Sequence, residues 1–386
     1  MFSNRVPGDR RPNAFTTALA RAKARGPILD LTVSNPTAAG FTYPADLLAP
    51  LADSAGLAYS PAAFGLDDAR AAVAETYRTR GLQISADRIV LTASTSEAYS
   101  LLFKLLCDPG ARVLTPVPSY PLFDYLTALD AVDQAPYTLE FHGSWTVDLE
   151  SLDAGWNDRT RCVLAVTPNN PTGSILRDGD AEELVGRCAA RNAALVLDEV
   201  FWDYPLASPL SEPAALRQPA ALTFRLGGLS KTAGLPQVKL GWIAVQGPDV
   251  AVVDALDRLE LICDTYLSVS TPVQLAARRL LERGAGIRTQ IVDRIQRNYA
   301  ALGARLAGSP ASLLPADGGW SAVMRVPATR PEEAIVLDLL ERDAVVVHPG
   351  YFFDFPGEAF LVVSVLTQPD VFDRGVRLLR DRLNAA

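Results

Sequence analysis

Histidines, cysteines and long apolar runs are scarce in this chain, and each shortage excludes a class of site or protein. The 386 residues include only two histidines and four cysteines, and no two cysteines stand in a CxxC spacing. A structural zinc cluster needs about four such ligands close together. We therefore expect no metal site, and we interpret the cysteines as buried free thiols in a reducing compartment.

The sequence indicates neither a membrane span nor a nucleic-acid surface. No segment holds the ~18 uncharged apolar residues that a spanning helix needs, and the opening MFSNRVPGDRRPNAF lacks the apolar stretch of a secretory signal. The formal net charge is -8, and no Lys/Arg run forms the basic face that phosphates require. We expect a cytoplasmic protein that binds neither nucleic acid nor membrane.

Short apolar strands alternate with helical stretches through the first two thirds of the chain. Six runs rich in β-branched residues lie at 88–94, 112–119, 161–168, 193–199, 221–226 and 239–245. This order is typical of βαβ units, and continuous apolar runs indicate strands covered on both faces. The predicted fold class is α/β, with a mostly parallel sheet sandwiched by helices. Ligands of such folds bind at the carboxyl ends of the strands.

A second, smaller α+β domain is predicted beyond residue 248. Helices are expected at 248–262, 272–284, 286–307, 331–342 and 368–384, interleaved with the strand-like GGWSAVMRVP, AVVVHPG and FLVVSV. The amphipathic stretch 14–26 is expected to form a helix that packs on this domain. The predicted organisation is an N-terminal arm (1–43) joining the small domain, a large domain (44–275) and a small C-terminal domain (276–386).

Lys231 and Asp198 follow apolar strands. Lys231 lies in the glycine-bounded loop GLSKTAGLPQVKLGW, where it is either a solvated lysine or an amine that forms a Schiff base with an aldehyde cofactor. Asp198 ends the run AALVLD, where an unpaired carboxylate would cost several kcal/mol. A protonated pyridine nitrogen would be a suitable partner; a structural ion pair or helix cap is the alternative.

Three further segments carry polar or aromatic groups at strand ends. In TPNNPTG, flanking prolines present Asn170 rigidly, as a donor or as part of a plain Asx turn. The backbone N–H groups of the segment 94–96 open a helix, either as an anion site or as ordinary caps, and Lys239 could add positive charge. Tyr120 could stack on a planar ring or belong to the core.

Together these segments resemble the fold type I, class I/II aminotransferase family, over about residues 29–380. The residues that carry the resemblance, in order and approximate spacing, are Tyr59, Ser94-Thr95-Ser96, Tyr120, NNPTG, Asp198-Glu199-Val200 and Ser230-Lys231. The resemblance implies the aminotransferase fold and a homodimer dependent on pyridoxal 5'-phosphate (PLP), with active sites shared between subunits.

The resemblance also implies a role for each matching residue. Lys231 would be the Schiff-base lysine, Asp198 the partner of the pyridine nitrogen, and Asn170 the donor to the phenolate oxygen. The remaining matches concern the ring and the phosphate: Tyr120 would stack on the ring, Ser94, Thr95, Ser96 and Lys239 would cradle the phosphate, Tyr59 would arrive from the partner subunit, and Ser270 and Thr271 would lie near the partner's phosphate.

Three residues depart from the family pattern. Phe201 stands where a tyrosine would hydrogen-bond the cofactor, and Lys239 stands where many relatives carry arginine. Val362, in FLVVS, aligns with the arginine that binds the substrate carboxylate. The alternatives for that carboxylate are Arg21, Arg25, Asn35, Arg225, the partner chain or an unusual substrate.

The expected activity is transfer of an amino group between an amino acid and a 2-keto acid. A lyase, decarboxylase or cyclase acting on an amino-acid-derived substrate would use the same residues, because Asp198 stabilises any carbanion at the α-carbon. Both SNPT (34–37) and HPGYFF (348–353) resemble loops that line the substrate side, which makes Asn35 and Val362 candidate substrate contacts. A PLP-sensing DNA-binding regulator is disfavoured by the acidic charge.

Overall fold

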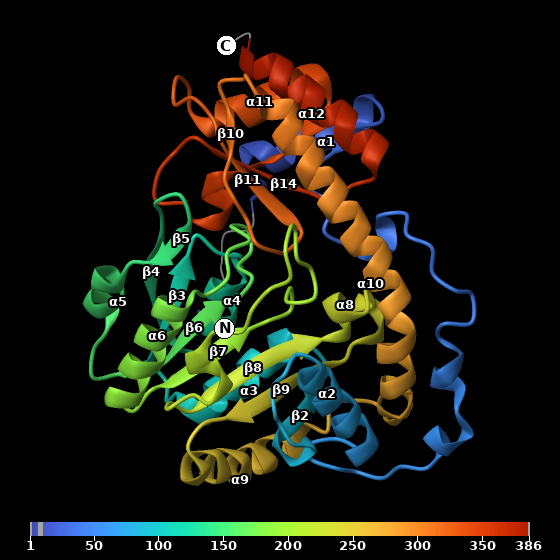
Figure 1. Ribbon diagram of the computed structural model, residues 1–386, viewed down its shortest axis with the longest axis vertical. Helices are drawn as coiled ribbons and strands as arrows, with labels where there is room; N and C mark the ends of the chain where they lie inside the picture. Colours follow the sequence, from blue (N-terminus) through green and yellow to red (C-terminus); the bar gives the residue numbers. More distant parts are fainter. Residues whose placement is uncertain (1, 7–10, 385–386) are drawn as a thin grey trace.

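The computed structural model describes residues 2–6 and 11–384 (Figure 1). The helices are α1 (Ala14–Arg25), α2 (Asp67–Thr79), α3 (Thr95–Leu106), α4 (Leu122–Leu129), α5 (Leu149–Gly155), α6 (Asp178–Ala190), α7 (Ala214–Arg217), α8 (Leu229–Thr232), α9 (Asp249–Tyr266), α10 (Thr271–Leu306), α11 (Glu332–Asp343) and α12 (Pro369–Asn384). Short 3-10 helices are η1 (Pro36–Ala38), η2 (Ala49–Ala52), η3 (Ser54–Leu57), η4 (Ala86–Arg88), η5 (Pro236–Val238) and η6 (Gly350–Phe353).

The strands form one large sheet and two small ones. They are β1 (Leu29–Asp30), β2 (Ile89–Thr92), β3 (Arg112–Val117), β4 (Asp133–Phe141), β5 (Trp145–Val147), β6 (Thr160–Val166), β7 (Ala194–Asp198), β8 (Thr223–Gly228), β9 (Gly241–Gln246), β10 (Ser312–Leu313), β11 (Ser321–Arg325), β12 (Val345–Val346), β13 (His348–Pro349) and β14 (Phe360–Ser364). All six apolar runs singled out in the sequence are strands.

The large sheet has eight strands in the order β2-β9-β8-β7-β6-β3-β4-β5. Strands β8, β7, β6, β3 and β4 run parallel to one another, whereas β9 and β5 pair antiparallel with their neighbours. The prediction of a mostly parallel sheet is therefore confirmed. The hairpin of β4 and β5 was not predicted, because no strand signal was assigned between residues 133 and 147.

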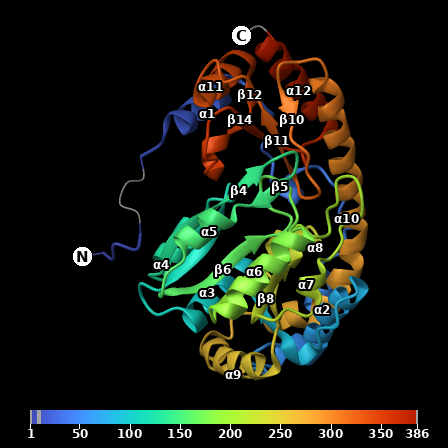
Figure 2. The same cartoon turned by 60° about the vertical axis from the view of Figure 1, so that its left-hand side comes forward.

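Helices cover both faces of this sheet, as the continuous apolar strands predict. Alternate residues of β7 enter different cores: Val196 packs in the cluster that includes Leu259 of α9, and Leu197 packs in the cluster that includes Leu184 of α6. Figures 1 and 2 show α9 and α6 on different sides of the sheet. Both faces of β7 are thus buried, which makes the end of that strand a desolvated position.

The stretch predicted as two helices, 272–284 and 286–307, is the single helix α10 of 36 residues. The two predicted helices are continuous, and Gly284, which lies inside α10, has a packing reason: a Cβ there would lie 2.3 Å from the Cβ of Ala233. Glycine lets α10 approach the turn after α8 closely. Figure 1 shows α10 running from the large domain to the small domain, beside α8.

The small domain contains a four-stranded antiparallel sheet in the order β10-β11-β14-β13. The N-terminal segment joins this domain, because β1 pairs in parallel with β12 and the Arg21 side chain of α1 forms an ion pair with Glu341 of α11. That association was expected. The predicted boundary between residues 275 and 276 falls inside α10 and stays a prediction.

Membrane-spanning helices and metal-binding clusters were looked for among the described residues. Among the helices formed by residues 2–6 and 11–384, none is both long and apolar enough to cross a membrane. Across the same residues, no group of three or more His, Cys, Asp or Glu side chains is arranged to hold a metal ion. The four cysteines are free thiols.

Candidate active site

A cavity of about 430 Å³ is lined by residues from both domains. The large domain contributes the first turn of α3, the end of β7 and the α8 turn, and the small domain contributes residues of β11, β13 and β14. It brings together ten residues singled out in the sequence: Ser94, Thr95, Ser96, Tyr120, Asn170, Asp198, Phe201, Lys231, Lys239 and Val362. The strand ends therefore meet as βαβ topology predicts.

The amine of Lys231 is held in this cavity without a hydrogen bond. Its Nζ lies 4.9 Å from the ring centroid of Trp320 and 5.6 Å from that of Phe201, and no described residue forms a hydrogen bond or an ion pair with it. Burial lowers the pKa of Lys231, and the negative charge of Asp198 opposes this shift. A lowered pKa favours the neutral amine, which is the nucleophilic form.

The carboxylate of Asp198 is buried and has hydrogen bonds but no ion pair among the described residues. It accepts from the Tyr99 hydroxyl at 2.9 Å and from the Val200 N–H at 3.1 Å. Burial raises the pKa of Asp198 to about 6, while both hydrogen bonds and the charge of Lys231 act to lower it. A desolvated carboxylate of this kind is suited to a cationic partner, and a protonated pyridine nitrogen meets that requirement.

The first turn of α3 presents free donors to the same cavity. Ser94 caps the helix by accepting from the Glu97 N–H at 3.1 Å, and the Glu97 carboxylate accepts from the N–H of Ala93, the residue before the cap, at 2.6 Å. The N–H groups of Thr95 and Ser96 belong to the first turn, where a helix offers them no acceptor. An anion such as a phosphate fits there.

Gly241, the first residue of β9, and Lys239, two residues before it, lie next to the first turn of α3 and to the cavity. A Cβ on Gly241 would lie 2.9 Å from the carbonyl carbon of Ser94 and 3.1 Å from the Thr95 nitrogen, so glycine alone permits the close approach of β9. Lys239 lines the cavity from a left-handed backbone conformation, with φ of 60°. Holding a non-glycine residue in that conformation costs about 1–3 kcal/mol, which is typical of functional positions.

The side-chain amide of Asn170 is oriented by the small domain. Its Oδ1 accepts from the Ser321 hydroxyl at 3.0 Å, which leaves the Nδ2 donors available to a ligand. The Asn170–Pro171 peptide is cis. The carbonyl of the amide thus links the two domains, and its N–H group is the one that a phenolate oxygen would require.

Phe201 stacks edge-on against Trp320, with ring centroids 5.3 Å apart. Tyr204, three residues later, packs on the same indole at 5.0 Å and donates its hydroxyl hydrogen to the backbone carbonyl of Lys231. Phenylalanine provides no hydroxyl at position 201. The hydroxyl of Tyr204 does not replace it, because it is bonded to the backbone of the α8 turn.

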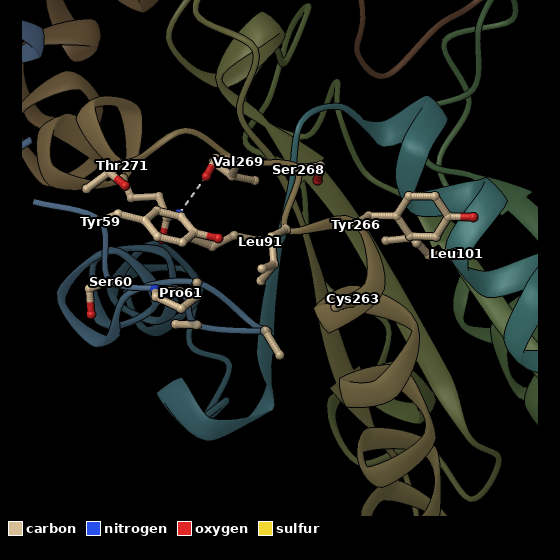
Figure 3. Close-up of a pocket in the computed structure, with 15 residues that line it drawn as sticks. Tyr59, Ser60, Pro61, Leu91, Leu101, Cys263, Tyr266, Ser268, Val269 and Thr271 are labelled. Atoms are coloured by element: carbon tan, nitrogen blue, oxygen red, sulfur yellow. Dashed lines mark hydrogen bonds between the residues drawn. The ribbon is translucent and has the colours of Figure 1, made fainter.

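Tyr59 and Asn35 lie outside the cavity, as do Ser270 and Thr271. Tyr59 is 75% exposed and lines a separate hollow together with Thr271 (Figure 3). Asn35 caps η1, where its Oδ1 accepts from the Thr37 N–H at 3.0 Å and the Thr37 hydroxyl at 2.8 Å. Ser34 and Thr32, adjacent to Asn35, line the cavity instead.

The suggestion that Arg225 binds the substrate carboxylate is wrong. Its side chain is fully buried and forms ion pairs with Glu199 and with Glu212, the latter at 2.8 Å. Arg80 bonds to the same two glutamates, at 3.0 and 3.1 Å. The guanidinium groups balance the two buried carboxylates, so Arg225 has no free face for a ligand. Of the other arginines considered, Arg21 pairs with Glu341 at 2.8 Å.

Sequence reasoning missed Tyr99, Trp320 and Ser321 as parts of the site. Tyr99 lies one helical turn after Thr95, so a helix starting at the predicted anion site places both on one face. That spacing could have identified Tyr99 as a residue facing Asp198. Trp320 and Ser321 come from the small domain, and no local signal relates them to the residues that they contact.

The fold is that of the type I aminotransferases. An aminotransferase structure from Escherichia coli matches with a TM-score of 0.85 at 22% identity, covering 99% of this chain and 98% of that one. Alanine aminotransferase from Pyrococcus furiosus matches with a TM-score of 0.88 at 21% identity, covering 100% of both chains. At these identities the likeness shows a shared fold.

The chain belongs to the class I and II aminotransferase family, whose profile matches residues 27–377. The glutamate-pyruvate aminotransferase AlaA of E. coli is 26% identical over 359 residues, covering 89% of this chain and 87% of the relative. The alanine aminotransferase of Mycobacterium tuberculosis is 27% identical over 365 residues, covering 90% and 83%. The protein is thus a PLP-dependent enzyme that transfers amino groups.

Proposed function

We propose that Lys231, Asp198 and Asn170 hold PLP in the cavity and that Lys231 carries the substrate proton during amino-group transfer. One observation carries this proposal: a largely buried amine without a hydrogen bond shares a cavity with a buried carboxylate that has no ion pair among the described residues. Such a pair is unfavourable unless a ligand joins it.

The cofactor, when bound, supplies a conjugated ring that accepts the electron pair left when the substrate's α-proton is removed. Asp198 keeps the ring nitrogen protonated, because its negative charge raises that nitrogen's pKa. The Asn170 amide donates to the phenolate oxygen, with its own carbonyl fixed by Ser321. Lys231 holds the cofactor covalently in the resting enzyme.

Lys231 acts in turn as nucleophile and as base. Its lowered pKa favours the neutral amine, which is the form that would take a proton from the substrate's α-carbon and return it on the cofactor side. The N–H groups of Thr95 and Ser96, with the Lys239 ammonium, would hold the phosphate. The ring of Tyr120 lies on the same cavity wall and is proposed to stack on the cofactor.

We further propose a homodimer in which Tyr59 enters the partner's active site. Large apolar side chains exposed near Tyr59 include Leu57 at 91%, and Leu261 and Tyr266 of α9 are exposed at 74% and 55%. Such exposure supports an interface on this face. The hollow in Figure 3 contains Tyr59 and Thr271, two of the three residues expected near the partner's phosphate.

We also propose that the protein is cytoplasmic and that its amino donors are among those named for its relatives. The four free cysteines support a reducing compartment. Alanine and glutamate are the first amino donors to test, because the E. coli relative is named a glutamate-pyruvate aminotransferase and the M. tuberculosis relative an alanine aminotransferase.

Borohydride labelling tests the assignment of Lys231. The chain has four lysines, at positions 23, 104, 231 and 239. Reduction of the PLP-loaded protein is expected to fix the cofactor to position 231, as measured by peptide mass spectrometry. Lys231→Ala should abolish both the label and the amino-group transfer, whereas Lys104→Gln should change neither. A label at another lysine, or transfer by Lys231→Ala at the wild-type rate, contradicts the proposal.

A further inference from the structure

Both substrates of an amino-acid transaminase carry a carboxylate, which requires a cationic or N–H donor in the cavity. Among the described residues that line the cavity, no arginine is present, and the side chains able to carry a positive charge are Lys231, Lys239 and His348. The proposed function already uses the two lysines for the cofactor. His348 is therefore the cationic group left in this chain for a substrate carboxylate.

His348 lies on the cavity-facing side of the small sheet. It pairs across β13 and β14 with Val362, which in turn pairs with Val323 of β11. Side chains of directly paired residues project from the same face of a sheet. His348 and Val362 both line the cavity, so the imidazole is next to the position where an arginine was expected and valine stands.

The imidazole has no hydrogen bond to any described residue. Three aromatic rings surround it: Phe15 at 6.2 Å, Phe352 at 5.5 Å and Phe353 at 5.8 Å between centroids. Burial lowers the pKa of His348, and the charge of Asp30 on β1 opposes the shift. An imidazole in an apolar setting with unused ring nitrogens gains strongly from a ligand that is negatively charged.

A second N–H donor of the same cavity is also unused. Trp320 is 4% exposed, and its indole Nε1 has no hydrogen-bond acceptor among the described residues. Buried polar groups normally have partners, but this nitrogen is inaccessible to solvent, so it reaches a ligand in the cavity only if the indole shifts. His348 and Trp320 both come from the small domain, whereas the cofactor-handling lysines come from the large one.

We propose that His348 binds the carboxylate of the amino-acid and keto-acid substrates as an imidazolium. This inference rests on the proposed function of the cavity and deepens it, since it assigns the substrate contact. The carboxylate supplies the hydrogen-bond acceptor that the imidazole lacks among the described residues, and valine at position 362 is a smaller neighbour than the arginine expected there. The specificity for an acid over the corresponding amine then resides in one ring.

Single-turnover conversion of the PLP-loaded protein tests this assignment. The probes are L-alanine and ethylamine, which differ in the carboxylate, and the readout is the second-order rate constant from the change in cofactor absorbance. The wild-type protein is expected to prefer L-alanine. His348→Phe keeps an aromatic ring and should lower the rate constant for L-alanine by about 10- to 100-fold, while the value for ethylamine stays within about twofold.

Three more variants sharpen the result. His348→Gln keeps a polar side chain without a charge and should lose about tenfold with L-alanine, whereas His348→Arg restores a cation and should lose less than His348→Phe. His142→Phe is the matched control, because His142 is the chain's other histidine and its exposed ring bonds to Glu140 at 3.0 Å. That control should match the wild-type protein with both probes.

The two assignments fail in different ways. Loss of borohydride labelling at Lys231 in the wild-type protein would contradict the proposed function. Normal labelling with equal L-alanine rates in wild type and His348→Phe would overturn the role of His348 alone, and would point to the partner subunit. An equal loss with both probes, or a wild-type protein without preference for L-alanine, would also overturn it, because the carboxylate would then not be what His348 recognises.

Discussion

Replacing Asp198 by asparagine should stabilise the cofactor-free protein while it impairs the enzyme. The folded pKa of Asp198 is about 6, above the usual value of 3.8. Between these pH values the folded protein therefore keeps a proton that the unfolded chain has released. The free energy of unfolding falls as the pH rises through this window, and the full penalty is present above about pH 6.

The size of the effect follows from the shift. About two pKa units at 1.36 kcal/mol each give roughly 3 kcal/mol of instability at pH 8 that Asp198→Asn would remove. Asparagine is nearly isosteric, and its Oδ1 can still accept from the Val200 N–H. The PLP-loaded variant should nevertheless react on the order of 10²-fold more slowly, because the positive charge on the cofactor ring loses its partner.

Urea unfolding of the cofactor-free proteins at pH 4 to 8 measures this prediction. The difference between Asp198→Asn and wild type should be near zero at pH 4 and grow to about 3 kcal/mol at pH 8. Asp257→Asn, on the exposed side of α9, is the control and should show no such trend. A difference that does not vary with pH, or a variant less stable than wild type at pH 8, refutes the reasoning.

Three other variants test the supports of the site. Lys239→Gln should raise the dissociation constant of PLP about tenfold in an absorbance titration, because the phosphate loses a charged donor; an unchanged constant removes Lys239 from the cradle. Arg225→Met should cost about 3–5 kcal/mol in chemical denaturation, since two buried glutamates would share one remaining arginine, and a neutral effect would contradict the network's role. Gly284→Ala should destabilise by about 1–3 kcal/mol through its clash, whereas Gly286→Ala, with open space around its Cβ position, should stabilise slightly, and equal effects would show that packing is not the cause.

The sheet and most of the residues that line the cavity could be predicted because their signals are local. A continuous apolar run followed at once by Asp198 predicts a buried strand with a carboxylate at its end, and β7 has that form. The short segments around Asn170 and Lys231 likewise contain their own turn and strand signals. Parallel topology then brings these strand ends together without further information.

The remaining features depend on contacts between distant segments. The packing role of Gly284 depends on Ala233, 51 positions earlier in the chain. Arg225 looked like a possible substrate contact, and only the packed fold reveals that Glu199 and Glu212 occupy it. The hydrogen bond that orients Asn170 comes from Ser321 in the other domain, so no local sequence pattern predicts it.

The long helix α10 has a mechanical consequence for the enzyme. From its contact at Gly284 to its end at Leu306 it extends about 33 Å, at 1.5 Å per residue. A tilt of about 5° at that contact would carry the far end through about 3 Å, a distance comparable to a hydrogen bond. A tilt of α10 at Gly284 would therefore move the small-domain end of the helix further than the α8 turn, so the position of the small domain is geometrically coupled to the turn that contains Lys231.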